Sequence, residues 1–132
     1  MATAIRSFDT VEHPLPASLG TCLLIHDFLS PRECAELIAQ ARERGFASAQ
    51  ADYPPSYRDN ERQVVDDAAL AQHLLLRLRG WIPETIVDAD GATWRLAALN
   101  ERLRLCRYRT GQQFRIHQDG VHHRGSGERS LL

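Results

Sequence analysis

The sequence predicts an α+β domain, because its apolar patterns change along the chain from strand to helix and back to strand. Residues 21–28 form an apolar run of strand length, and two stretches with helical spacing follow it. From residue 94 onward the apolar residues occur in short runs separated by glycine-bearing turns, which is typical of strands. Helices placed ahead of the strands favour a layer that braces one side of a largely antiparallel sheet. A length of 132 residues suits one domain, and we expect a single domain over 1–132.

The first helix is predicted by its start and stop signals. Ser30 is a typical N-cap residue, Pro31 suits the first helical position, and Glu33 can complete a capping box with Ser30. Apolar residues recur at helical spacing over 34–41, and Gly45 is placed to end the helix.

A second helix is expected from Asp67 to Arg79, capped by Asp66 or Asp67 and stopped by Gly80. Between the two helices, the stretch 47–60 contains Pro54-Pro55 and is expected to be a surface loop. The apolar stripe of the second helix consists of Leu70, Leu74 and Leu78.

The remaining elements are expected to be strands joined by turns. Asp90-Gly91 predicts a turn, and strands are expected over Arg102–Tyr108 and Gln113–Asp119. The stretch 122–128 is polar and bears glycines, so it predicts a loop. After it, Arg129–Leu132 begins an apolar run with the character of a strand whose remainder lies beyond the end of the chain.

The charge is unevenly distributed, although the formal net charge is only -1. Residues 1–94 carry 8 Arg against 14 acidic residues, whereas 95–132 carry 8 Arg against 3. All basic residues other than histidine are arginine, which excludes mechanisms that need a lysine Schiff base or a lysine general base. Aromatic residues among the C-terminal arginines are limited to Tyr108 and Phe114, so the pattern does not favour nucleic-acid binding. The arginines in question are Arg102, Arg104, Arg107, Arg109 and Arg115.

The cysteines and the N-terminus point to a reducing compartment. Cys22, Cys34 and Cys106 are odd in number and lack a C-x-x-C spacing, so neither a disulfide framework nor a thiolate zinc site is indicated. The first residues lack the pattern of a secretory signal, and no apolar stretch approaches the roughly 20 residues that span a bilayer. We therefore expect a cytoplasmic protein without a membrane segment.

The most informative motif is His117-Gln118-Asp119. In an extended strand, residues two apart point to the same side, so the imidazole of His117 and the carboxylate of Asp119 can bind one metal ion. These are two of the three ligands of a 2-His-1-carboxylate site, the arrangement that leaves positions open on Fe(II). The spacing therefore predicts that the two side chains converge.

Six segments of the chain occur together in one order: FLSPRECAELIAQA, RDNER at 58–62, LNERLRLCRY at 99–108, GQQF at 111–114, HQDG, and GERSLL at 127–132. Through them, roughly four fifths of the chain, from about Ile25 onward, resembles the prolyl 4-hydroxylase-like branch of the Fe(II)- and 2-oxoglutarate-dependent dioxygenases, which has these segments in the same order. The family fold is a double-stranded β-helix, related to the jelly roll, with flanking helices from the N-terminal part. The resemblance thus implies N-terminal helices packed on a partial double-stranded β-helix sheet.

The resemblance also implies residue roles and cosubstrates. His117 and Asp119 match the first histidine and the carboxylate of the iron triad, and Tyr108 matches the tyrosine that helps hold 2-oxoglutarate. Such oxidoreductases couple decarboxylation of 2-oxoglutarate by O2, giving succinate and CO2, to hydroxylation of a C–H bond. Fe(II) is the metal, and ascorbate is an expected reductant. Whether the substrate is a prolyl side chain, another residue or a small molecule is left open.

The chain departs from the family pattern at its C-terminal end. The distal histidine and the basic residue that pairs with 2-oxoglutarate belong to strands after the GERSLL-like segment, which here ends at Leu132. The resemblance therefore implies the N-terminal portion of an oxygenase domain, truncated at its C-terminus, with two iron ligands and little activity by itself.

Two alternatives remain open from the sequence. In one, a local cluster in HQDGVHH holds a zinc-type ion that activates water for hydrolysis, through His117, Asp119, His122 and His123. In the other, the chain is a non-catalytic fragment or binding domain that associates through an exposed sheet edge. That edge would begin at Arg129–Leu132, with Leu131 and Leu132 near the contact.

Overall fold

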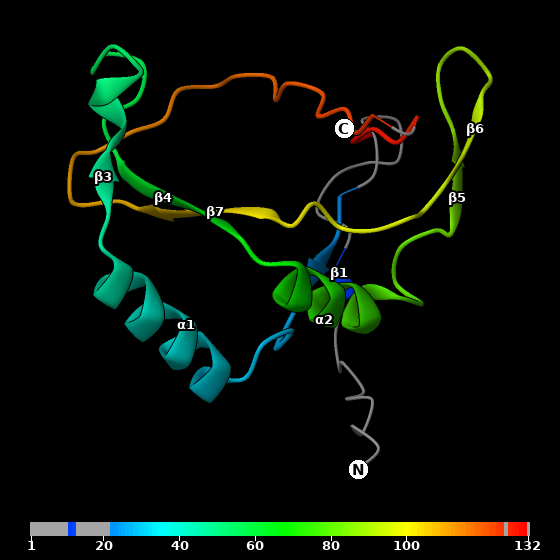
Figure 1. Cartoon of the computed structure of the whole chain (residues 1–132), viewed down its shortest axis with the longest axis horizontal. Coiled ribbons are helices and arrows are strands. Elements are labelled where there is room, and N and C mark those ends of the chain that lie inside the picture. The colour runs from blue at the N-terminus through cyan, green and yellow to red at the C-terminus, as the bar shows by residue number, and fades with distance from the viewer. Residues whose placement is uncertain (1–10, 13–21, 126, 132) are drawn as a thin grey trace. The chain divides into compact units, whose positions relative to one another are not determined.

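The computed structural model describes residues 11–12, 22–125 and 127–131 (Figure 1). Contacts group the chain into two units, 1–40 and 41–132, and each is described by itself. In the first unit, β1 (Val11–Glu12) pairs antiparallel with β2 (Leu24–Ile25). The strand expected over 21–28 is therefore shorter than predicted, and Asp27 follows it with a positive φ of 53°.

Helix α1 (Pro31–Arg44) has the capping box that the sequence predicts. The Ser30 N–H donates to Glu33 Oε2 at 2.8 Å, and the Glu33 N–H donates to Ser30 Oγ at 3.3 Å. Gly45 ends the helix with a φ of +83°, a conformation that glycine adopts without strain. Gln63 Nε2 then donates to the carbonyls of Ala41 and Gly45, which satisfies two acceptors at the helix end.

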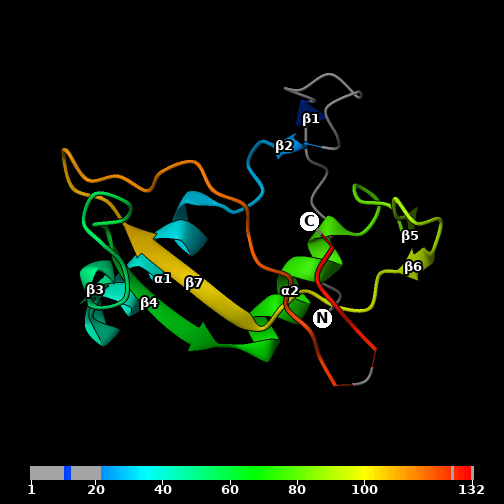
Figure 2. The same cartoon turned by 90° about the horizontal axis from the view of Figure 1, so that it is seen from above.

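The main sheet has three antiparallel strands in the order β3 (Ala47–Ser48), β4 (Glu61–Asp66) and β7 (Arg102–Arg107). Strands β4 and β7 lie side by side over six residue pairs, from Glu61 opposite Arg107 to Asp66 opposite Arg102 (Figure 2). An ion pair lies at each end of this ladder. Arg107 Nε is 2.8 Å from a Glu61 oxygen, and Arg102 Nη1 is 3.2 Å from an Asp66 oxygen. Strand β4 was not predicted. The loop expected over 47–60 also holds β3 and a short 3-10 helix, Ala49–Ala51.

Helix α2 (Ala68–Leu78) begins and ends where the sequence predicts. The Asp67 side chain accepts from the Leu70 N–H at 2.8 Å, and Gly80 follows the helix with a φ of +94°. Leu75 and Ala71 are its buried residues, at 1% and 3% exposure. The predicted stripe of Leu70, Leu74 and Leu78 is only half-buried, so the core-facing line lies one position further along the helix.

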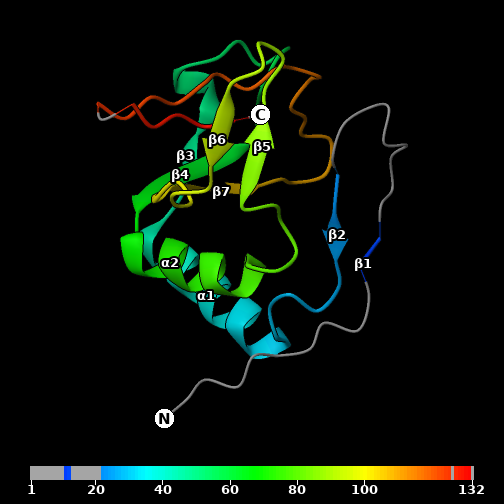
Figure 3. The same cartoon turned by 90° about the vertical axis from the view of Figure 1, so that its right-hand side faces the viewer.

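The turn predicted at Asp90-Gly91 joins a hairpin of β5 (Thr85–Val87) and β6 (Thr93–Arg95) (Figure 3). Asp88 organises this turn, because its Oδ1 accepts from the N–H groups of Asp90 and Ala92 at 3.0 and 2.9 Å. Its Oδ2 accepts from the Trp94 indole N–H at 2.7 Å. One carboxylate thus holds both the turn and the aromatic ring of the second strand.

Acid should loosen this hairpin through Asp88. The Trp94 hydrogen bond, then the Ala92 and Asp90 N–H groups and the Arg129 charge, hold the pKa of Asp88 below its ordinary value of 3.8, against an opposing effect of burial. A lowered folded-state pKa means that the stabilisation is present above the ordinary value and is lost as pH falls through the lowered one. We expect Trp94 fluorescence to change below pH 3.8 in the parent chain and to lose that step in Asp88→Asn. An unchanged acid transition in the variant would contradict the assignment.

The expected strand over Gln113–Asp119 is not formed. Only Phe114 makes a bridge, to Arg58, and the Arg115 N–H donates to the Tyr57 carbonyl at 3.0 Å. Ile116 beyond them is fully exposed, so no sheet face covers the second half of the segment. The prediction failed because this stretch pairs with a short irregular loop, which cannot continue the ladder.

The segment from His122 turns back on itself. The Ser130 N–H donates to the His122 carbonyl and the Arg124 N–H donates to the Glu128 carbonyl, both at 2.8 Å, around a bridge between His123 and Arg129. The run expected to open a new strand is therefore paired within the chain as far as Ser130. Leu132 lies outside the described residues.

The described elements make an α+β fold, as predicted: two α-helices together with antiparallel sheets. Among the residues that the structure describes, no helix is both long and apolar enough to cross a bilayer.

Candidate metal site

The loop 57–60 holds the segment that leads to His117. Asp59 accepts from the Gln113 N–H through its side chain and from Gln112 Nε2 through its carbonyl, both at 2.7 Å. The Arg115 N–H donates to the Tyr57 carbonyl. These hydrogen bonds fix the backbone up to Arg115 against a loop that precedes β4.

Two polar side chains of the same loop are buried. Arg58 is 6% exposed and Asn60 is fully buried, and Arg58 Nε donates to Asn60 Oδ1 at 2.8 Å. Arg58 Nη2 donates to Cys106 Sγ on β7 at 3.3 Å. Cys106, for which the sequence suggested no role, thus helps to hold this guanidinium.

Phe114 joins the buried arginine to the predicted ligand. The Arg58 Cζ lies over the Phe114 ring, 4.1 Å from its centroid. The His117 imidazole is stacked on Phe114, with centroids 3.7 Å apart and ring planes inclined by 21°. Tyr57 meets the same phenyl ring edge-on at 5.5 Å. His117 therefore rests on an aromatic platform that the sequence did not predict.

The side chains of His117 and Asp119 converge, as the spacing predicts. His117 Nε2 lies 3.2 Å from Asp119 Oδ1. The reason differs from the one expected, because neither residue is in a strand. A second contact sets the ring: His117 Nδ1 lies 2.7 Å from the Arg115 carbonyl oxygen. A carbonyl can only accept, so Nδ1 carries the hydrogen, and in the neutral form of the ring the lone pair is on Nε2.

This arrangement places two electron-rich atoms opposite each other. The Nε2 lone pair and a carboxylate oxygen repel unless a cation or a proton lies between them. Two donors that bind one ion at about 2.0–2.2 Å, at an angle of about 90–109°, lie roughly 3.0–3.5 Å apart. The 3.2 Å separation falls in that range. His117 is 28% and Asp119 71% exposed, so an ion and further ligands can reach the pair from solvent.

The third predicted site residue is not joined to the other two. Tyr108 directly follows β7 and is half-exposed, and its side chain makes no hydrogen bond to another described residue. Its role as a 2-oxoglutarate contact stays a prediction.

The hydrolytic cluster expected as an alternative is not assembled. Within the described residues no three His, Cys, Asp or Glu side chains lie close enough to hold one ion. The backbones of His122 and His123 are engaged instead with Ser130 and Arg129, in the segment that turns back. The structure therefore does not bring the four side chains together within the described residues, and the hydrolytic alternative stays an untested prediction.

The arginines considered as a nucleic-acid surface are partly neutralised by a carboxylate. Glu61 accepts from Arg107 at 2.8 Å and from Arg109 at 3.2 Å. The Arg107 hydrogen bond, with a smaller one from Arg109, lowers the pKa of Glu61, and Glu61 in turn raises the pKa of Arg107. Two of the five arginines considered as a nucleic-acid surface are therefore committed to one carboxylate.

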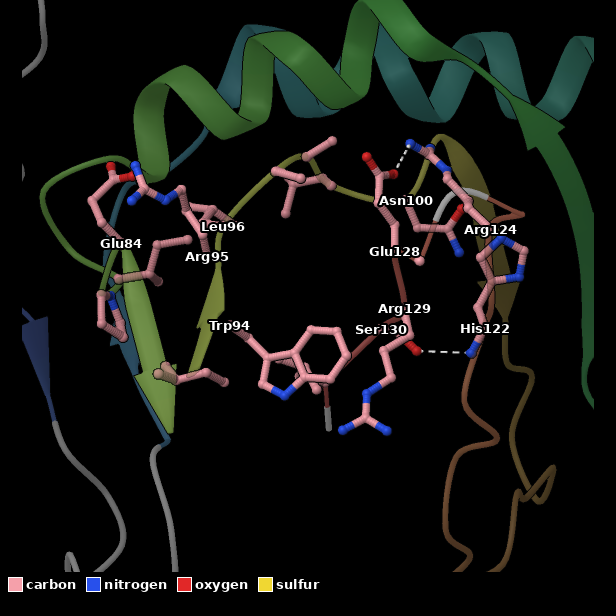
Figure 4. A pocket seen from close by; sticks show the side chains of 18 residues that line it. Glu84, Trp94, Arg95, Leu96, Asn100, His122, Arg124, Glu128, Arg129 and Ser130 are labelled. Carbon is pink, nitrogen blue, oxygen red and sulfur yellow. Dashed lines mark hydrogen bonds and ion pairs between the residues drawn. The ribbon is translucent and has the colours of Figure 1, made fainter. Parts of the chain in front are cut away.

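A cavity of about 490 Å³ lies elsewhere in the second unit (Figure 4). It is lined by residues of the segments 82–86, 94–100, 122–124 and 127–131. Its walls include Trp94, with the Arg129 guanidinium 4.1 Å from its ring, and the ion pair of Arg124 with Glu128. Arg129 is also paired with Asp88 at 2.9 Å. Neither His117 nor Asp119 lines this cavity, so the cavity is separate from the candidate metal site.

Sequence reasoning missed three residues that support the site, namely Arg58, Asn60 and Phe114. The only available signal was their presence in the RDNER and GQQF segments, which carried the family resemblance without a role for these side chains. Comparisons of the chain with protein-family models, with curated proteins and with solved structures found no match.

Proposed function

We propose that this chain carries part of the iron site of an Fe(II)- and 2-oxoglutarate-dependent dioxygenase of the prolyl 4-hydroxylase-like kind. One observation carries the proposal: the Arg115 carbonyl fixes the His117 tautomer, which directs Nε2 toward the Asp119 carboxylate. Metal-binding histidines commonly donate their other ring N–H to a carbonyl in this way. The family fold, a double-stranded β-helix, is part of the same proposal.

The donor set fits Fe(II), which accepts one neutral imidazole together with a carboxylate and open positions. When bound, iron would activate O2 and 2-oxoglutarate for hydroxylation of a C–H bond. The protein's part is to supply His117 Nε2 and Asp119 Oδ1 in a fixed relation and to leave their outer side open. We propose that the Tyr108 hydroxyl donates a hydrogen bond to 2-oxoglutarate. Whether the substrate is a peptide or a small molecule stays open.

With two ligands from the described residues, we expect this chain to bind Fe(II) weakly and to release little or no succinate. The test is succinate release in the presence of iron, 2-oxoglutarate and ascorbate, with Asp119→Ala as the control for background chemistry. Robust release that depends on Asp119 would contradict the two-ligand account and would show that further ligands complete the site. No iron binding at all would contradict the proposed function.

A second candidate, self-association through a sheet edge, is favoured by the position of β7. This strand is at the edge of the main sheet, and no described strand pairs with its outer side. Unpaired N–H and C=O groups at such an edge favour pairing with another chain, although the alternating Arg102 and Arg104 oppose close approach. A second copy of this chain is the proposed occupant.

Light scattering over a concentration series tests this candidate. We expect the average mass to rise with concentration. Leu131→Ser tests the C-terminal contact that the sequence predicts and should weaken the association, because Leu131 is 37% exposed. Leu76→Ser, at an exposed apolar position on α2, is the matched control and should have no effect. A monodisperse monomer at every concentration would rule out association through this edge.

A further inference from the structure

We infer that Arg58 is a positioning residue for the candidate metal site. It holds Phe114 in place, and Phe114 holds the His117 ring in the orientation that directs Nε2 toward Asp119. The inference rests on the proposed function for the ligand role of His117. The buried Arg58 guanidinium thus orients His117 without itself binding the metal.

Arg58 is fixed more firmly than a surface arginine. It is 6% exposed, and two of its nitrogens donate to Asn60 and Cys106. Asn60 is itself anchored, because its carbonyl accepts from the Ala49 N–H at 2.9 Å and its Nδ2 donates to the Glu61 carbonyl at 3.4 Å. The loop and β7 therefore determine where this guanidinium lies.

The charge of Arg58 has no carboxylate partner among the described residues. Burial of a guanidinium is costly unless other groups compensate its charge. A planar guanidinium over an aromatic face gains electrostatic attraction from the ring, and this attraction strengthens away from water. The Phe114 ring, 4.1 Å from Arg58 Cζ, is the nearer of two aromatic rings that face the buried charge, and Tyr53 is the other at 5.6 Å. Arg58 and Phe114 are thus coupled, and displacement of either one disturbs the other.

His117 depends on this pair because little else holds it. Residues 116–121 make no backbone hydrogen bond to any other described residue. The ring is placed by its stack on Phe114 and by the Nδ1 contact with the Arg115 carbonyl. If Phe114 moves, the imidazole loses the platform that keeps it in the plane required for that contact.

The first experiment uses the metal-free chain, so that it does not depend on metal binding. The His117 ring protons are measured by NMR, because the phenyl ring current at 3.7 Å shifts them upfield, and long-range ¹H–¹⁵N spectra report which nitrogen carries the hydrogen. We expect Phe114→Leu to remove the upfield shift and to mix the two tautomers, whereas Phe114→Tyr retains both signatures. Arg58→Met should reduce the upfield shift, with Arg58→Lys intermediate.

The matched control is Arg129→Met. Arg129 also lies over an aromatic ring, that of Trp94 at 4.1 Å, and is paired with Asp88, but no contact among the described residues connects it with Arg58 or Phe114. It should leave the His117 signals unchanged. Circular dichroism identifies variants that fail to fold. If Arg58→Met does not fold, Arg58→Lys tests the role of Arg58, and the Phe114 pair tests the contact between Phe114 and His117.

The second experiment measures Co(II) affinity for the same variants. We expect Phe114→Leu and Arg58→Met to weaken binding by about tenfold or more, the usual effect of removing a group that orients a ligand. Unchanged His117 signals and unchanged affinity in both folded variants would overturn the inference and leave the proposed function intact. Absence of Co(II) binding in the parent chain would overturn the proposed function, while the metal-free spectra would still decide whether Arg58 positions the ring.

Discussion

Replacement of His117 by alanine is expected to reduce divalent-metal affinity by on the order of 100-fold, since a direct ligand should matter at least as much as a group that orients one. The imidazole supplies the nitrogen of the pair, and Asp119 is 71% exposed and has no other printed ion-pair partner among the described residues that could replace it as a second ligand. Calorimetric or NMR titration with Co(II) measures the loss. The fold should persist, because His117 lies in a segment outside the helices and strands.

The matched control for this prediction is His122→Ala. His122 lies on the other side of Gly120 and uses its backbone, not its ring, to bond Ser130. Its replacement should leave the affinity unchanged. Equal losses in the two variants would show that the metal binds through a diffuse group of histidines, contrary to the account of a defined pair.

Leu75→Ala is expected to cost about 2–5 kcal/mol of unfolding free energy, the usual effect of truncating a fully buried leucine. Leu75 is 1% exposed and is the largest fully buried apolar side chain among the described residues. Because domains of this size are typically stable by about 5–15 kcal/mol, the loss would be a large part of the total.

Leu76→Ala controls for helix propensity in the same helix. Leu76 is 58% exposed, so its truncation should change the free energy by no more than about 0.5 kcal/mol. Urea unfolding of both variants gives the difference. A loss of similar size at the two positions would mean that α2 does not bury the face that the structure assigns to it.

The helices were predictable because their signals are local. The capping box of Ser30 and Glu33, the Asp67 cap, and the glycines after each helix act within a few residues, so the sequence contains them in full. The Asp90-Gly91 turn is of the same kind. Only the choice between neighbouring stripes on α2 depended on packing, and there the prediction was one residue out.

Strand β4 was not predictable in this way. Its sequence, Glu-Arg-Gln-Val-Val-Asp, has two adjacent apolar residues and no alternation, so no period-two pattern marks it. What makes it a strand is its partner, because β7 supplies a full ladder and ion pairs at both ends. The same dependence explains the opposite error at Gln113–Asp119, where a strand-like pattern meets only a short loop.

The candidate site was predictable in part. The convergence of His117 and Asp119 was predicted from strand spacing; the two side chains do converge, but outside any strand, so the spacing argument does not account for their placement. The platform beneath His117 could not be predicted, because Arg58 and Phe114 are 56 positions apart and meet only through tertiary structure. Nothing in the local sequence indicates that Arg58 is buried without a carboxylate partner.

The most direct test of the central claim is an anaerobic Fe(II) titration of the isotope-labelled chain, followed by paramagnetic broadening in NMR spectra. Binding between His117 and Asp119 predicts that broadening begins at these two residues and at Phe114, and that signals of His122 and His123 are affected later. Broadening centred on His122 and His123, or none at millimolar iron, would contradict the claim and leave the His117–Asp119 contact as a simple ion pair.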